Sequence, residues 1–125
     1  MPLLSGSKMN HNRAGQLAEA AARLYMRLHG YRIVAANVRG GRGTRIGETD
    51  FIACRGRILV FVEVKKRATL EGAAYAIKPL QQTRIRNAAL NFCRQHPSYN
   101  DYDIRFDAVL IAFPCHIRHI ENAWQ

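Results

Sequence analysis

Acidic residues and long apolar runs are both scarce in this chain of 125 residues. Nine Asp and Glu stand against 19 Lys and Arg, so the formal net charge is +10 and the isoelectric point lies near 10.3. This imbalance favours a polyanionic partner, because each phosphate that a basic side chain neutralises releases condensed counterions. The apolar runs are only as long as strands, which argues against a membrane-spanning segment.

Cysteine is rare as well, and no export signal is evident. Cys54, Cys93 and Cys115 are odd in number and far apart, which fits neither a disulfide framework nor a zinc site. The first ten residues, MPLLSGSKMN, have no apolar core or cleavage pattern. The histidines lie at element ends or on opposite strand faces, which argues against a histidine-ligated metal. We therefore expect a cytoplasmic protein that does not bind membranes.

The pattern of apolar and turn residues predicts an α/β domain with a mixed sheet and a helix on each side. Residues 1–12 are expected to be a flexible N-terminus and residues 13–125 a single domain. The predicted elements are a helix at Arg13–His29, strands at Tyr31–Val38, Phe51–Cys54 and Ile58–Lys65, a helix from Pro79, and strands at Ile104–Phe113 and His116–Trp124.

The first predicted helix has a leucine-rich stripe. Leu17, Ala21, Leu24 and Leu28 recur at i, i+4, i+7 and i+11, which predicts an amphipathic helix that ends at Gly30. Glu19 lies on the opposite side of the helix. From the residues alone, an exposed ion pair between Glu19 and Arg23 is the preferred interpretation.

The run ILVFVEVK, Ile58–Lys65, places two charges at the end of an apolar strand. Alternation puts Glu63 and Lys65 on one face of the strand. If Arg55 and Gly56 form the preceding turn, Asp50 lies across from Phe61 and one diagonal step from Glu63.

Two carboxylates at that spacing can share a divalent cation. Magnesium usually takes one or two protein carboxylates and fills its other positions with water and phosphate. With Lys65 beside them, Asp50 and Glu63 have the parts for metal-assisted phosphodiester hydrolysis. Structural ion pairs at a strand end explain the same residues equally well.

A basic loop precedes this region. The segment RGGRGTRIG, residues 39–47, combines Arg39, Arg42 and Arg45 with four glycines, and Lys66 and Arg67 follow Lys65. We predict contact with DNA phosphates, because arginine binds phosphate in bidentate fashion and glycine permits close approach. A solvated surface loop is the alternative.

The combined motifs resemble the YraN-type family of small bacterial proteins, over nearly the whole chain after about residue 11. The matching residues are Gly15 and Glu19, Asn37 and Arg39, Gly47–Asp50, Phe61–Lys65 with Arg67, and Arg105–Asp107. That family is similar to archaeal Holliday-junction resolvases and to the restriction-endonuclease-like PD-(D/E)-x-K superfamily, whose core has the order αβββαβ.

The resemblance implies roles for individual residues. Asp50 and Glu63 would hold Mg²⁺ or Mn²⁺, with Glu19 approaching from the first helix, and Lys65 would assist the attacking water or stabilise the phosphate. Glu48 and Gln81 are weaker candidates.

We therefore expect a metal-dependent, structure-selective DNA endonuclease, acting on branched DNA or Holliday junctions. The alternatives are a DNA-binding accessory protein with a weak or unused site, and a basic structural domain. A homodimer is also considered, because resolving a symmetric junction takes two cuts.

Overall fold

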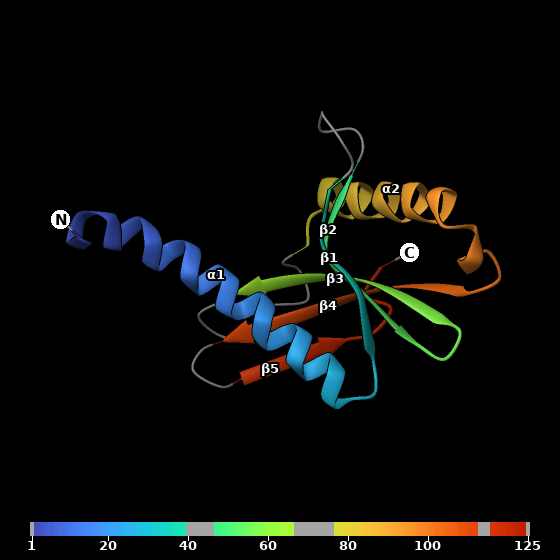
Figure 1. Ribbon diagram of the computed structural model, residues 1–125, viewed down its shortest axis with the longest axis horizontal. Helices are drawn as coiled ribbons and strands as arrows, with labels where there is room; N and C mark the ends of the chain where they lie inside the picture. Colours follow the sequence, from blue (N-terminus) through green and yellow to red (C-terminus); the bar gives the residue numbers. More distant parts are fainter. Residues whose placement is uncertain (1, 40–46, 67–76, 113–115, 125) are drawn as a thin grey trace.

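The computed structural model describes residues 2–39, 47–66, 77–112 and 116–124, without the side chains of residues 2–12, Ala14 and Arg39. Its elements run in the order α1, β1, β2, β3, α2, η3, β4, β5 (Figure 1). Their bounds are α1 Pro2–Leu28, β1 Arg32–Arg39, β2 Glu48–Arg55, β3 Ile58–Lys66, α2 Pro79–Gln95, the 3₁₀ helix η3 Pro97–Tyr99, β4 Asp103–Ala112 and β5 His116–Ile120.

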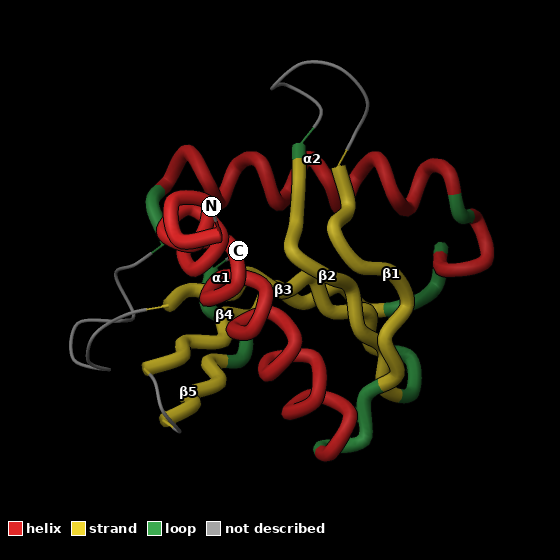
Figure 2. The backbone as a smooth tube through the Cα atoms, turned by 60° about the vertical axis from the view of Figure 1, so that its left-hand side comes forward, coloured by secondary structure: helices red, strands yellow, loops and turns green. Residues whose placement is uncertain are grey.

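The five strands form one mixed sheet in the order β1-β2-β3-β4-β5. Neighbouring strands are antiparallel except β3 and β4, which are parallel and joined by the crossover that contains α2. The two long helices cover opposite faces of the sheet (Figure 2). The predicted αβββαβ core is therefore confirmed, and the further strand predicted at His116–Trp124 is present as β5 at the edge of the sheet.

Strand alternation sorts the core into two layers. Along β3, Leu59 and Phe61 belong to the layer under α2, and Val60 and Val62 belong to the layer under α1. In the described part of the chain, no helix is both long and apolar enough to cross a lipid bilayer.

Helix α1 packs on the sheet with its small residues, not with its leucines. Ala18, Ala22 and Met26 are buried, whereas Leu17, Leu24 and Leu28 are exposed. The leucine stripe that indicated the helix therefore does not face the sheet. The helix has two apolar stripes, and the alanine stripe faces the sheet because short side chains let the helix axis approach the bulky side chains of the strands. The helix also begins at Pro2, well before the predicted start at Arg13.

The turn between β2 and β3 lies one residue later than predicted. Arg55 pairs with Ile58, so Gly56 and Arg57 are the central residues of the turn. Gly56 has a φ of 61°, a left-handed conformation that glycine adopts without steric cost. The whole register moves with the turn, and each β2 residue faces a β3 residue two positions further along than expected.

Gly47, at the entrance to β2, lies against the backbone of α2. Its φ is 88°, and a Cβ atom built on it would lie 2.3 Å from the carbonyl oxygen of Arg84 and 2.5 Å from the amide nitrogen of Ala88. No side chain fits there. The last glycine of the basic loop therefore brings β2 and α2 together.

Candidate active site

The corrected register places Asp50 directly across from Glu63. The ladder between β2 and β3 runs from Arg55 and Ile58 to Phe51 and Val62, so Asp50 and Glu63 are the next opposing residues. Both point to the face of the sheet that α2 covers, because Ile52 and Phe61 on the same sides belong to the core under α2. Opposing side chains begin about 4.5–5.5 Å apart at Cβ, closer than the diagonal step predicted from the sequence.

Two side chains of β2 bind the backbone of β3 where the ladder ends. The amide nitrogen of Val64 donates a hydrogen bond of 2.7 Å to Oδ2 of Asp50, and Oγ1 of Thr49 donates one of 3.0 Å to the carbonyl oxygen of Val62. These bonds replace backbone pairing between the diverging strands. They also fix the Asp50 carboxylate beside Glu63.

Glu63 is buried and has two further polar partners. Nζ of Lys65 lies 3.4 Å from Oε2 of Glu63, and the side-chain amide of Gln81 on α2 donates a hydrogen bond to the same oxygen. The site therefore combines two strands of a local hairpin with the first turn of a distant helix. Gln81, a weak candidate from the sequence, lies within the site.

Burial raises the pKa of Glu63 to about 8, and the negative charge of Asp50 adds to this effect while Lys65 opposes it. Burial also raises the pKa of Asp50, although the hydrogen bond from Val64 acts in the opposite direction. The interaction between the two carboxyl groups lowers the pKa of Asp50 and raises that of Glu63. Two acids that resist simultaneous ionisation form a suitable site for a divalent cation, which would neutralise both charges.

Replacing Glu63 with glutamine is expected to stabilise the metal-free protein above about pH 5. Between pH 4.5 and 8 the folded chain keeps a proton that the unfolded chain releases, so the wild-type free energy of unfolding falls as pH rises through this window. Glu63→Gln has no such loss and should gain roughly 2–4 kcal/mol by pH 8. Urea unfolding in EDTA at pH 5 and pH 8.5 measures the difference, and a gain that does not grow with pH would contradict the buried acid pair.

Glu19 lies on α1, which covers the opposite face of the sheet. Its carboxylate is 4.0 Å from Nη1 of Arg23, the pair that the residues alone favoured. Among the described residues, no group of three or more His, Cys, Asp and Glu side chains gathers as a metal site. The structure thus joins Asp50 and Glu63 but does not bring Glu19 to them as a third ligand.

The other predicted residues are only partly described. Glu48 is exposed on β2, and its charge helps to raise the pKa of Asp50. Lys66 is exposed at the end of β3, and the backbone of Arg39 pairs with that of Glu48. Arg42, Arg45 and Arg67 lie outside the described residues.

Asn37 was not predicted as a site residue, yet it lies beside Asp50. It falls between the register pairs of Ala36 with Phe51 and Val38 with Thr49, which aligns it with Asp50 on the neighbouring strand. Its φ of 52° is left-handed, a conformation that asparagine tolerates better than most residues. The only signal in the sequence was the Asn37-x-Arg39 spacing.

Asp107 belongs to a separate polar cluster on the α1 face. The Arg105 guanidinium binds both of its carboxylate oxygens at 2.8 Å, Nε2 of His119 lies at 2.6 Å, and the amide nitrogen of Asn122 donates at 3.0 Å. Burial alone would raise the pKa of Asp107, but these hydrogen bonds outweigh it and lower the pKa. Every oxygen is used within the fold, so Asp107 has a structural role.

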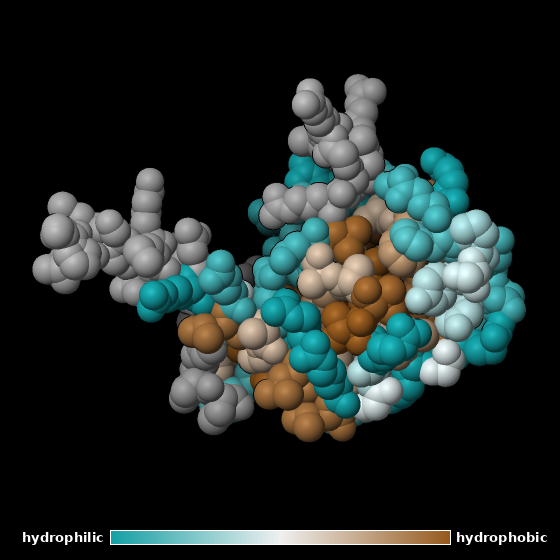
Figure 3. All heavy atoms as spheres, viewed as in Figure 1, coloured by the Kyte–Doolittle hydropathy of each residue, from teal (hydrophilic) through white to brown (hydrophobic). Residues whose placement is uncertain are grey.

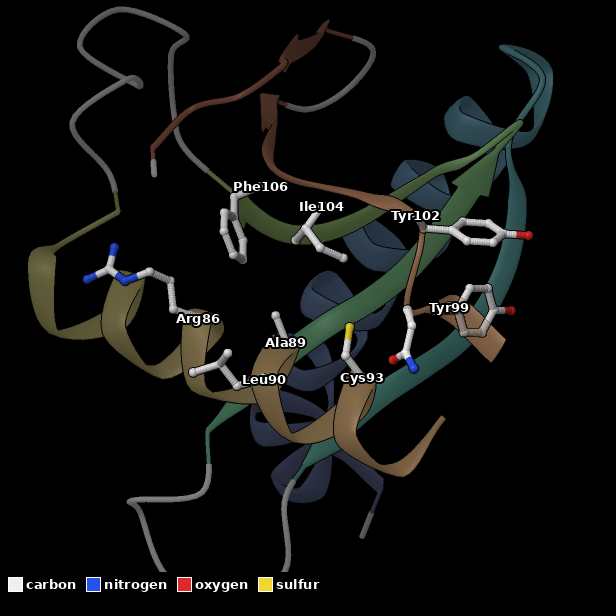
Figure 4. A pocket seen from close by; sticks show the side chains of 9 residues that line it. Arg86, Ala89, Leu90, Cys93, Tyr99, Tyr102, Ile104 and Phe106 are labelled. Atoms are coloured by element: carbon white, nitrogen blue, oxygen red, sulfur yellow. The ribbon is translucent and has the colours of Figure 1, made fainter. Parts of the chain in front are cut away.

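A hollow of about 430 Å³ lies between α2 and the segment from η3 to β4 (Figure 4). Its lining is mainly apolar and consists of Arg86, Ala89, Leu90, Cys93, Tyr99, Asn100, Tyr102, Ile104 and Phe106. It contains no carboxylate and none of the predicted site residues, so the candidate chemistry lies at the β2–β3 hairpin.

The αβββαβ core with an acid pair on its β2–β3 hairpin defines an α/β domain built on a mixed five-stranded sheet. Residues 18–111 match the family described as Uncharacterised protein family UPF0102, and the chain belongs to that family. The UPF0102 protein amb4503 of Paramagnetospirillum magneticum is 45% identical over 114 residues, covering 90% of this chain and 88% of the relative. A UPF0102 protein of Rhodopseudomonas palustris strain BisB18 is 48% identical over 112 residues, covering 90% and 80%.

Among solved structures, the chain is similar to Hjc of Archaeoglobus fulgidus, a Holliday junction resolvase from an archaeal hyperthermophile. The TM-score is 0.47 at 15% sequence identity, and the match covers 82% of this chain and 72% of the archaeal chain.

Proposed function

We propose that this protein is a metal-dependent, structure-selective DNA endonuclease that hydrolyses phosphodiester bonds in branched DNA. The observation that carries the proposal is the pair formed by Asp50 and Glu63, two acids with raised pKa values beside a lysine. Burying two acidic side chains side by side lowers the stability of the fold. This cost favours a functional role for the pair over a purely structural one.

Asp50 and Glu63 would hold Mg²⁺ or Mn²⁺ as its two carboxylate ligands. A bound cation would polarise the phosphate and lower the pKa of the attacking water. Gln81 would keep the Glu63 carboxylate oriented through its amide hydrogen bond. Two acids anchored by backbone and amide hydrogen bonds require little rearrangement when the cation enters.

Lys65 is the residue best placed to meet the substrate. Its side chain is about one-fifth exposed and reaches Glu63 from the rim of the site, so a phosphate can approach it from solvent. With Glu63 serving as a ligand, the Lys65 ammonium group would be available to the phosphate. There it would stabilise the charge that develops during hydrolysis.

The DNA contacts are proposed for Arg39, Arg42, Arg45, Lys66 and Arg67. The net charge of +10 supports a nucleic-acid partner, and Lys66 directly follows Lys65 on β3. Phosphate contacts would position the DNA, and selectivity would come from the shape of the branch and not from base sequence. A homodimer would supply the two cuts that a symmetric four-way junction requires.

Titration calorimetry with Mn²⁺ tests the cation site. Wild type should bind, while Asp50→Ala and Glu63→Ala should lose about tenfold or more in affinity, because each removes one of two carboxylate ligands. The control is Asp103→Ala, which removes an exposed acid at the start of β4. Equal binding by all four proteins would refute the site.

A cleavage assay with linear, flapped and four-way DNA in Mg²⁺ or Mn²⁺ then tests the enzyme. Wild type should nick branched DNA, and Lys65→Ala should be slower by about 10²-fold or more with little change in Mn²⁺ affinity. Mn²⁺ and DNA binding without nicking would favour the alternative of a DNA-binding accessory protein.

A further inference from the structure

Helix α1 presents large apolar side chains to solvent. Leu17, Leu24 and Leu28 are 59%, 54% and 75% exposed, although they occupy one flank of a helix whose other flank is buried. Figure 3 faces the outer side of α1 and shows apolar side chains along the helix. Single exposed leucines are common, but an aligned row of three marks an interaction surface.

The spacing of this row indicates what kind of element covers it. Leu17, Ala21, Leu24 and Leu28, here called the leucine seam, are separated by four, three and four residues. This is the alternation of the a and d positions of a coiled coil. The stripe that packs on the sheet, Ala18 with Ala22 and Met26, has spacings of four only. Alternating spacings of four and three residues are typical of a surface that packs against another helix.

The charges beside the leucine seam indicate the charge that the partner helix carries. Arg13, Arg23 and Arg27 all project from one side of α1, between the seam and Glu19. Arg13 and Arg27 are exposed, and Arg23 lies 4.0 Å from Glu19. Glu19 is the only acidic residue in the sequence of α1. The seam is therefore bordered by positive charge, which an acidic partner would complement.

A second copy of the chain offers no acidic side chains at the positions that would face these arginines. If two α1 helices paired antiparallel with Leu17 against Leu28, Arg27 of one copy would lie beside Ala20 of the other, where no acid can meet it. The arginines of both copies would also border the same contact, so charge repulsion opposes pairing through this seam. The charges thus favour a different, acidic chain.

We propose that an acidic amphipathic helix of a partner protein docks on the leucine seam, with its apolar residues against the leucines and its Asp and Glu residues beside Arg13 and Arg27. The contact forms on the α1 face, whereas Asp50 and Glu63 lie on the α2 face, so docking leaves the candidate active site open. The seam has only four layers, so we expect a dissociation constant on the order of 1–100 µM. This inference does not depend on the proposed nuclease activity.

A synthetic helix tests the seam. The probe is a fluorescently labelled peptide of about three heptads, with leucine at the a and d positions and glutamate at e and g. Fluorescence anisotropy with the full chain should show binding, and a peptide with lysine in place of glutamate should bind about tenfold or more weakly. A scrambled glutamate peptide of the same composition should not bind. If the scrambled peptide binds as well as the probe, the proposal is overturned.

Substitutions on the chain locate the binding. Leu24→Lys/Leu28→Lys should weaken probe binding about tenfold or more, because it places two charges in the apolar contact. Both leucines are exposed, so this variant should keep the wild-type thermal transition and Mn²⁺ affinity. The matched control, Leu90→Lys, changes a leucine that is 64% exposed on α2 and should bind the probe as wild type does. Equal affinity in wild type and both variants would place the probe elsewhere and overturn the proposal.

A charge reversal tests the role of the arginines. Arg13→Glu/Arg27→Glu should exchange the preference, so that the lysine peptide binds this variant more tightly than the glutamate peptide does. An unchanged preference for glutamate would show that Arg13 and Arg27 do not select the partner.

Two further measurements test whether the seam is covered instead by a second copy of the chain or by a membrane surface. Self-association of the wild type in sedimentation, lost in Leu24→Lys/Leu28→Lys, would assign the seam to a second copy of the chain. Binding to phosphatidylserine vesicles, lost in the same variant, would assign it to a membrane surface. Either result would overturn the proposal, and neither would affect the cation site.

Discussion

Asp107→Ala is expected to lower the free energy of unfolding by about 3–5 kcal/mol, because removing one member of a buried charge cluster leaves the remaining charge buried and uncompensated. Asp107 is 0% exposed and is the shared acceptor for Arg105, His119 and the backbone of Asn122. Without it, the Arg105 guanidinium loses two charge-assisted hydrogen bonds in a largely dry environment. Urea unfolding at neutral pH measures the loss.

The chain contains a matched control for this substitution. Asp101 forms an ion pair with Arg57, but both side chains are more than half exposed. Asp101→Ala should therefore cost less than about 1 kcal/mol. Equal and small losses for Asp107→Ala and Asp101→Ala would show that the buried cluster does not stabilise the fold. Asp107→Asn, which keeps the shape but not the charge, separates the two contributions.

Gly47→Ala is expected to cost more than about 3 kcal/mol, since it combines overpacking with a backbone conformation that alanine resists. The new methyl group would collide with the backbone of α2 at Arg84 and Ala88, and neither atom belongs to a flexible side chain that could move aside. Thermal or urea unfolding measures the effect.

Gly56→Ala is the control for Gly47→Ala. Gly56 also has a positive φ, but nothing lies within 4 Å of its would-be Cβ. Its substitution should cost only the conformational penalty, about 1–2 kcal/mol. If both alanine variants lose the same stability, the close contact between β2 and α2 is not what requires glycine at position 47.

The sheet could be predicted from the sequence because its signals are local. Alternation along β3 assigns Glu63 and Lys65 to one face, and the apolar run fixes the strand. The position of the turn could not be predicted, because Arg55-Gly56 and Gly56-Arg57 are equally plausible central pairs. That single residue decided whether Asp50 lies diagonal to Glu63 or directly opposite it.

The orientation of α1 could not be predicted for a different reason. The helix has two apolar stripes, and hydrophobicity favours the leucine stripe, whereas packing against a bulky sheet favours the alanine stripe. Choosing between them requires the side chains that α1 meets, which come from β2, β3 and β4. The placement of Glu19 depends on this choice.

The spacing of the site residues along the chain also bears on the order in which the candidate site is assembled during folding. Asp50, Glu63 and Lys65 belong to one hairpin, and such local contacts close on a microsecond scale. The hydrogen bond from Gln81 closes a longer loop, because Gln81 lies 18 residues beyond Glu63 on a separate helix, so this contact has a larger entropic cost. During folding, the acid pair is therefore expected to come together before the helix that orients it has docked on the sheet.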